Sequence, residues 1–232
     1  YSVVTAMHRL AVEKGVEFIF NANVTGITVQ SDAVKKVITE TGVYEADVII
    51  GGADYHHIEQ TLLPNGFQSY DKSYWDRRVM APSCLLYFLG INKKLKHALH
   101  HSLFFDVPFD RHGHEIYESP QWPSDPLFYV SISSVTDPSA APEGCENLVF
   151  LVPVASGLTG DMEALRNKYF EQILSRFEQH LRENISESIV FKKSFSSSDF
   201  VVVFQPLSER RIPPTILITT TSNPAYMIRS VG

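Results

Sequence analysis

The segment Ala46–Asp54 constrains the fold of this chain more strongly than any other. Its sequence, Ala46-Asp47-Val48-Ile49-Ile50-Gly51-Gly52-Ala53-Asp54, is typical of a buried strand that runs into a two-glycine turn. Glycine lets the backbone turn sharply and approach a ligand closely, and ligands of such sheets lie beyond the carboxyl ends of the strands. An ordinary strand-to-helix turn with Asp54 as the helix N-cap explains the same residues, and the pattern alone favours that alternative.

The residues around this turn alternate between helix and strand patterns. Apolar residues recur at helical spacing up to Lys14, and Gly15 suits the end of that helix because glycine tolerates a positive φ. Strands are expected over 16–20, 24–30 and 34–39, and a helix over 55–63. This order predicts a partial α/β nucleotide-binding lobe over residues 1–65.

From about Ser69 the pattern changes to apolar strands bounded by Pro, Gly and Asp. Strands are expected over 83–91, 127–135, 147–154 and 188–195. A helix is expected over 161–183, where apolar residues form a stripe with a period of about 3.6 residues. The residues of this stripe are Met162, Leu165, Tyr169, Phe170, Ile173, Leu174, Phe177 and Leu181. We therefore predict a second lobe over 66–199, with a mixed or antiparallel sheet and flanking helices, and an α/β or α+β fold overall.

The composition is that of a globular protein, with 44% hydrophobic and 20% charged residues. A formal charge of −6 gives no basic footprint, so nucleic acid is not an expected partner. Cys84 and Cys145 are more simply explained as reduced thiols of an intracellular protein than as a disulfide. The longest near-apolar stretch, 79–91, is interrupted by Pro82 and is shorter than a membrane-spanning helix. An amphipathic pattern is already under way at residue 1, so we expect the chain to be a piece of a longer protein.

Side chains that often carry chemistry form no complete site in the sequence. Several histidines have spacings of three and four that suit one helix face, but no cysteine or carboxylate pattern completes a metal site. These histidines are His97, His100, His101, His112 and His114. We expect them in loops or at the surface, and we predict no metal. Ser156-Gly157 and Gly144-Cys145 form no hydrolase motif.

The second lobe is rich in aromatic residues, which suit either a long apolar channel or a protein core. The residues in question are Phe104, Phe105, Phe109, Tyr117, Trp122, Phe128 and Tyr129. The pattern favours a core.

Several separated segments carry a resemblance to a known family. Gly15-Val16-Glu17-Phe18-Ile19-Phe20-Asn21-Ala22-Asn23-Val24-Thr25-Gly26-Ile27, together with Ala46–Asp54, is similar to FAD-dependent amine-oxidase-like enzymes. Residues 74–91, with Tyr74-Trp75-Asp76-Arg77-Arg78-Val79-Met80-Ala81-Pro82, and residues 100–105 and 122–130 narrow the resemblance. Over residues 1–200 the chain resembles the bacterial phytoene desaturases, which belong to the carotenoid desaturase family.

This resemblance implies a Rossmann-like FAD lobe and a substrate lobe built on an antiparallel sheet. The implied activity is the FAD-dependent oxidation of C–C single bonds in phytoene or a related C40 carotenoid precursor. The implied FAD contacts are Val24, Gly51, Gly52, Ala53 and Asp54, and no catalytic residue is identified. An insoluble polyene substrate implies a cytoplasmic protein that is peripherally associated with a membrane.

The chain departs from the family pattern at both ends. The GxGxxG fingerprint, whose helix N-terminus holds the pyrophosphate of FAD, is absent from the sequence. Residues 200–232 depart from the family's second flavin-contacting segment and form an uncertain, divergent tail. We therefore expect the 232-residue chain to be incomplete and inactive alone. The alternative function is a non-catalytic domain that retains only the substrate lobe and binds an apolar ligand or a membrane surface.

Overall fold

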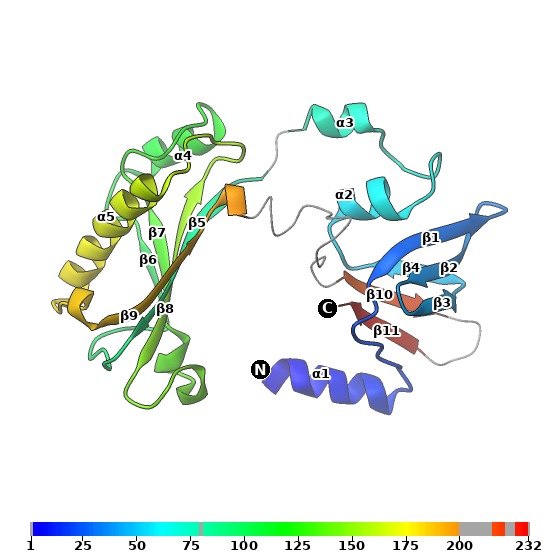
Figure 1. Ribbon diagram of the computed structural model, residues 1–232, viewed down its shortest axis with the longest axis horizontal. Helices are drawn as coiled ribbons and strands as arrows, with labels where there is room; N and C mark the ends of the chain where they lie inside the picture. The colour runs from blue at the N-terminus through cyan, green and yellow to red at the C-terminus, as the bar shows by residue number, and fades with distance from the viewer. Residues whose placement is uncertain (1, 79–80, 200–214, 221–225, 232) are drawn as a thin grey trace. The chain divides into compact units, whose positions relative to one another are not determined.

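The structure is a computed structural model that describes residues 2–78, 81–199, 215–220 and 226–231 (Figure 1). The chain divides into two compact units, one formed by Tyr1–Val79 with Val203–Gly232 and the other by Met80–Val202.

The first unit begins with helix α1 (Ser2–Glu13), which ends before Gly15. Gly15 has a φ of +84°, so the sequence located the end of this helix correctly. The strand predicted over 16–20 is wrong, since only an isolated bridge occurs there. Phe18 packs on His8 of α1 instead, with ring centroids 4.3 Å apart, and Phe18 and Phe20 stack on each other. Ring packing has thus replaced strand pairing.

Three antiparallel strands follow as a small sheet in the order β1-β2-β3: β1 (Val24–Gln30), β2 (Ala33–Thr39) and β3 (Gly42–Glu45). Its apolar side is a small core in which Val24, Ile27, Val37 and Leu62 are buried. The predictions for β1 and β2 are confirmed to within a residue, because alternating apolar residues in a sheet with one covered face give a clear period of two.

The predicted buried strand ahead of the glycine turn is shorter and more exposed than expected. Strand β4 covers only Val48–Gly51, and Val48 and Ile50 are each 49% exposed. Within the described residues β4 has one paired neighbour, β10 (Thr215–Thr220), which in turn pairs with β11 (Tyr226–Val231). Because β4 lies at the edge of this described sheet, neighbouring side chains flank it on one side only, and more of its surface stays exposed. The sequence did not predict β10 or β11, and residues 200–214, 221–225 and 232 of the tail lie outside the described part.

A short helical segment follows the glycine turn. Helix α2 (Tyr55–His57) continues into the π-helical turn η1 (Ile58–Leu62), which closes when the Leu63 amide donates to the Ile58 carbonyl at 3.1 Å. The predicted helix over 55–63 is therefore present in altered form. Single π turns are frequent at functional sites.

The first unit extends further along the chain than residue 65, where the sequence placed its boundary. Helix α3 (Lys72–Asp76) contributes Trp75, whose ring meets that of Tyr55 at 5.7 Å. Gln60 Nε2 donates to the Tyr70 carbonyl at 2.9 Å. Through these contacts, residues 66–76 pack with the first unit. The sequence boundary missed them because it rested on strand patterns, which do not reveal aromatic packing.

The second unit is built on an antiparallel sheet of five strands in the order β6-β7-β8-β5-β9 (Figure 1). The strands are β5 (Ser83–Ile91), β6 (His101–Phe104), β7 (Phe128–Ser131), β8 (Glu146–Val154) and β9 (Ile189–Phe195). β5, β8 and β9 match their predicted spans to within a residue. β7 is shorter than predicted because the 3₁₀ turn η2 (Ser133–Val135) ends it, and β6 was not predicted.

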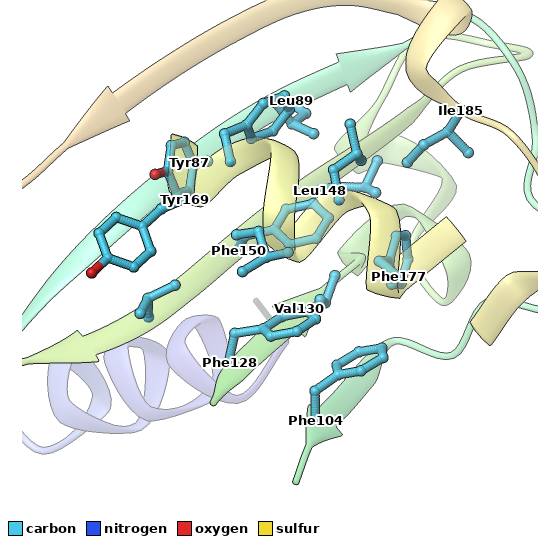
Figure 2. Close-up of a cluster of buried hydrophobic side chains, with 14 of the residues drawn as sticks. Tyr87, Leu89, Phe104, Phe128, Val130, Leu148, Phe150, Tyr169, Phe177 and Ile185 are labelled. Atoms are coloured by element: carbon cyan, nitrogen blue, oxygen red, sulfur yellow. The ribbon is translucent and has the colours of Figure 1, made fainter. Parts of the chain in front are cut away.

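Helix α5 (Glu163–Leu181) covers one face of this sheet. Six residues of its predicted stripe are buried, whereas Met162 is exposed because it precedes the helix as its N-cap. Figure 2 shows Phe150, Phe177 and Tyr87 within the layer between helix and sheet. Truncating a fully buried Phe to Ala costs about 3–5 kcal/mol, so this layer dominates the stability of the second unit.

The remaining helical elements lie in the connections of the second unit. They are helix α4 (Phe109–Tyr117) and the 3₁₀ turns η3 (Pro138–Ala140) and η4 (Ser186–Ser188). A fold that mixes helices with antiparallel sheets is confirmed. All strand pairings among the described residues are antiparallel, so a Rossmann-like arrangement of the first unit stays a prediction.

Candidate functional site

The glycine turn at the end of β4 positions four of the five predicted FAD contacts. Gly51 and Gly52 are exposed and Ala53 is half-buried. Asp54 Oδ1 accepts a hydrogen bond from the His57 amide at 2.9 Å, so Asp54 is the N-cap of α2. The structural alternative drawn from the sequence is therefore confirmed for Asp54.

Gly51 has a packing reason to be glycine. A Cβ added at Gly51 would lie 2.4 Å from Ile58 Cδ1, so the first turn after the strand closes directly over this residue. Its φ does not lie in the left-handed region. A side chain at position 51 would therefore require the end of the Ile58 side chain to shift, and no special backbone conformation is involved.

Val24, the fifth predicted contact, has a buried side chain at the start of β1. The register of β1 against β2 shifts between Val24 and Gly26, which marks a bulge at Thr25. Bulges re-aim a strand locally and are common beside sites. Val24 as a whole residue is only 2% exposed, so its main chain is covered as well as its side chain.

A buried carboxylate lies just after the glycine turn. Glu59 is 2% exposed and accepts hydrogen bonds from the Tyr55 hydroxyl and the Ser69 amide, both at 2.8 Å. Burial acts to raise the pKa of Glu59, but these hydrogen bonds outweigh it and the pKa is lowered, so the group is ionised near neutral pH. No sequence pattern singles out Glu59, since a single Glu in a helix is normally exposed.

Three buried side-chain atoms in this part of the first unit have no hydrogen-bond partner, namely His57 Nε2, Glu59 Oε2 and Trp75 Nε1. Unpaired buried polar atoms are uncommon in native proteins. They mark this segment as one whose polar groups are not satisfied by the described residues alone.

Of the predicted residues, Gly51, Gly52 and Ala53 are the ones accessible to FAD, and they would meet it through the main chain. The Val24 side chain belongs to the core, and the Asp54 carboxylate caps α2. Gly52 is exposed and Ala53 is half-buried, so the turn is accessible to a ligand beyond the strand end. None of the predicted contacts is a cation that would bind the pyrophosphate.

The second unit offers an extended apolar surface on the sheet face opposite α5. The register places five side chains side by side, one from each strand, in a row that we call the apolar row: Leu103, Tyr129, Leu151, Leu86 and Phe195. Their sequence neighbours, such as Leu85 and Phe128, point into the α5 core, so the row lies on the other face. Neighbouring strands are about 4.8 Å apart, which makes the row roughly 19 Å long.

A groove lies at the β6 end of this row, beneath α4. We call it the α4 groove, and it has a volume of about 260 Å³. Its lining residues are Leu103, Phe105, Phe109, His112, Gly113, Ile116, Tyr117, Leu127, Phe128, Tyr129 and Pro153. Those contributed by α4 recur at spacings of three and four, so one helix face forms one wall.

His112 joins this helix to the sheet. Its Nδ1 accepts from the Leu127 amide and its Nε2 donates to the Pro153 carbonyl, each at 2.9 Å. Burial lowers the pKa of His112, so the ring is neutral near pH 7 and both nitrogens are engaged.

The aromatic residues that the sequence assigned to a core are divided between core and groove. Phe104 and Phe128 are buried, and Trp122 packs against the core. Leu103, Phe105, Phe109 and Tyr117, at the rim of the groove, are 59% to 66% exposed. Period and composition do not separate these two groups, because tertiary packing decides which ring is covered.

The position in a loop or at the surface that the sequence predicted for the histidines is wrong for His112, which is buried on helix α4 because it packs between this helix and the sheet. Within the described ranges, no group of three or more His, Cys, Asp and Glu side chains is arranged to hold a metal ion. The part of the chain that the structure describes contains no helix both long and apolar enough to cross a bilayer. Lys93 binds Glu183 at 2.9 Å, and Lys94 lies 3.4 Å from Glu146, so both lysines have acidic partners.

Comparison with known proteins identifies relatives of the chain, although no family model matches it. A carotenoid 3,4-desaturase of Haloarcula japonica is 34% identical over 199 residues, which are 86% of this chain and 40% of that protein. A 1-hydroxycarotenoid 3,4-desaturase of a Flavobacterium species is 28% identical, over 79% of this chain and 37% of its own length. A zeta-carotene-forming phytoene desaturase of Myxococcus xanthus is 32% identical, over 66% of this chain and 29% of its own length.

The chain thus spans two fifths or less of the length of these relatives. The similarity covers most of this chain, including the glycine turn and the five-stranded unit, and it agrees with the family resemblance of the separated sequence segments. The chain belongs to the family of carotenoid and phytoene desaturases.

Proposed function

We propose that the protein desaturates a long isoprenoid of the carotenoid type, with FAD as its cofactor. The observation that carries this proposal is the 34% identity, over 86% of the chain, with a carotenoid 3,4-desaturase. The relatives are enzymes by name, so the alternative of a non-catalytic binding domain is not favoured.

The apolar row supports a long apolar substrate. An extended polyene has no hydrogen-bonding groups along its length, and it is bound by removing apolar surface from water, at about 25 cal/mol per Å². The row presents such a surface across all five strands, with four of its five side chains purely hydrocarbon. We propose that the polyene lies along this row.

The cofactor is proposed on family grounds, with support from the glycine turn. The main chain of Gly51, Gly52 and Ala53 would contact FAD, while Asp54 holds α2 in place. FAD supplies the oxidising power for removing two hydrogens from a C–C bond. The side chains of the row would orient the polyene and exclude water.

The proposal is tested by binding and by turnover. In a Trp75→Phe background, the 232-residue chain should bind an all-trans C40 polyene in detergent micelles, seen as quenching of the fluorescence of Trp122, which belongs to the second unit. The gene product that contains this chain should, with FAD, extend the conjugation of a C40 precursor, seen as a red shift in absorbance. Absence of both effects would reject the proposed function.

A matched pair of variants shows whether the row carries binding. Leu151→Gln places an amide at the centre of the row, and Leu99→Gln makes the same change at an exposed leucine outside it. We expect Leu151→Gln to weaken polyene binding about tenfold and Leu99→Gln to leave it unchanged. Equal effects would show that the polyene does not lie on the row.

Peripheral association with a membrane and a cytoplasmic location are also proposed, because a C40 hydrocarbon dissolves in bilayers and not in water. Flotation of the chain with liposomes tests the association. Recovery of all the protein in the bottom fraction would contradict it.

A further inference from the structure

We propose that the α4 groove receives one end of the isoprenoid chain and thereby sets how far the chain extends along the apolar row. This inference rests on the proposed function, and it adds a subsite for the terminal part of the substrate. Four properties of the groove carry it: its position, its chemistry, its size and the space at Gly113.

The position of the groove makes it the end of the row. β6 is an edge strand of the five-stranded sheet, so the row stops at Leu103. Leu103 and Tyr129 belong to both the row and the groove. A chain that lies along the row towards β6 therefore passes directly into the groove.

The chemistry of the groove suits a hydrocarbon. Its lining contains no Asp, Glu, Lys or Arg. The one imidazole, His112, is neutral and has both nitrogens occupied by the Leu127 amide and the Pro153 carbonyl. Exposed apolar side chains gathered around one hollow mark a binding site more often than a plain surface, and here Phe105, Phe109 and Tyr117 form such a rim.

The size of the groove suits part of a long ligand. Pockets that enclose a whole drug-sized molecule measure about 300–1,000 Å³, whereas this groove measures about 260 Å³. Its lining includes buried residues, namely His112, Leu127 and Phe128, and exposed residues such as Phe105, Phe109 and Tyr117. A terminal segment of one or two isoprene units is therefore the natural occupant.

Gly113 supplies the free space in the helix wall. A Cβ at Gly113 would have a single neighbour within 4 Å, Phe109 Cε1 at 4.0 Å. A larger side chain at this position would project into the groove without disturbing the backbone. Leu is also a better helix former than Gly, so Gly113→Leu should fold and fill the groove.

Photo-crosslinking tests the inference directly. The probe is a C10 isoprenoid carrying a diazirine, irradiated with the 232-residue chain and mapped by mass spectrometry. We expect labels on Phe105, Phe109 or Tyr117, at least a tenfold lower yield in Gly113→Leu, and protection by excess C40 polyene. The matched control, His114→Leu, adds the same side chain at an exposed position of α4 outside the groove lining and should label like the parent chain.

A second variant guards against a folding artefact. Phe109→Ser shortens an exposed rim residue and should reduce labelling while far-UV circular dichroism stays unchanged. Labels that map elsewhere, or that persist in both Gly113→Leu and Phe109→Ser, overturn the inference. A C40 polyene that binds the chain without protecting the groove overturns the inference and leaves the proposed function intact. A polyene that does not bind at all counts against the proposed function itself.

Discussion

Replacing Asp161 by asparagine should destabilise the second unit by about 2 kcal/mol at neutral pH. Arg166 binds Asp161 through two parallel hydrogen bonds, Nε to Oδ1 at 2.7 Å and Nη2 to Oδ2 at 2.6 Å. The Asp161 side chain is only 6% exposed. Arg166 also binds Asp199 at 2.7 Å, and its carbonyl accepts from Tyr87 in the core at 2.6 Å.

The magnitude follows from the pKa of Asp161. The hydrogen bonds from Arg166 lower this pKa from 3.8 to about 2. One pKa unit corresponds to roughly 1.36 kcal/mol, so the difference between the ordinary and the folded pKa of Asp161 corresponds to about 2 kcal/mol. Because the pKa is lowered on folding, this stabilisation is present above pH 3.8 and is lost as the pH falls through about 2. Removing one partner of a buried pair costs up to about 3–5 kcal/mol, but Asp199 still neutralises Arg166, so we expect the smaller value.

The assay is urea unfolding followed by Trp122 fluorescence in a Trp75→Phe background, since the chain has 2 tryptophans and Trp122 belongs to the second unit. The free energy of unfolding of Asp161→Asn should be lower than that of the parent by about 2 kcal/mol at pH 7, and this difference should disappear as the pH approaches about 2. Asp106→Asn is the matched control: Asp106 also binds an arginine, Arg176, but is 48% exposed, and such surface pairs contribute about 0–1 kcal/mol. The same difference in the free energy of unfolding at every pH would refute this reasoning.

Three further predictions concern the candidate sites. Gly51→Ala should lower the free energy of unfolding by about 1 kcal/mol, because the added Cβ meets Ile58 Cδ1. Ile58→Val removes this methyl group, so the double variant should lose less than the sum of the two single variants. Losses that simply add would contradict the packing explanation. The pKa of His112 is lowered by burial, so its contribution to stability is complete above the ordinary histidine pKa of 6.5 and falls as the pH drops through the lower folded pKa. His112→Gln should therefore flatten the dependence of the free energy of unfolding on pH between about pH 7.5 and about pH 5.5. The 232-residue chain should bind FAD at well below one per chain, because it has no GxGxxG loop, and stoichiometric flavin absorbance after gel filtration would show that the glycine turn suffices.

Elements with strong local patterns were predicted well. The helix over 161–183 and the strands over 83–91, 147–154 and 188–195 were each found to within two residues, because their apolar periodicity reflects a helix and a sheet that bury one face each. The strand predicted over 16–20 was wrong because Phe18 and Phe20 pack through their rings rather than against a neighbouring strand. The edge strand β6 is too short, at four residues, for alternation to be evident.

The candidate site was predictable only in part. The glycine turn and the N-cap role of Asp54 follow from local sequence, because both depend on residues within four positions of each other. Glu59 was missed because its burial depends on Ser69 and Tyr55 closing around it. The contact between Gly51 and Ile58 was missed for the same reason, since it depends on how the chain turns after β4.

The sequence by itself determined the family of this protein, the alternation of its strands and the buried stripe of α5. A period shows which side chains share a face, and family motifs are read residue by residue. Only the tertiary structure decided that Leu103, Tyr129, Leu151, Leu86 and Phe195 form one row and that α4 closes a groove at its end. Strand order and register are set by pairing between distant segments, so the surface on which a substrate can lie exists only once those segments have met.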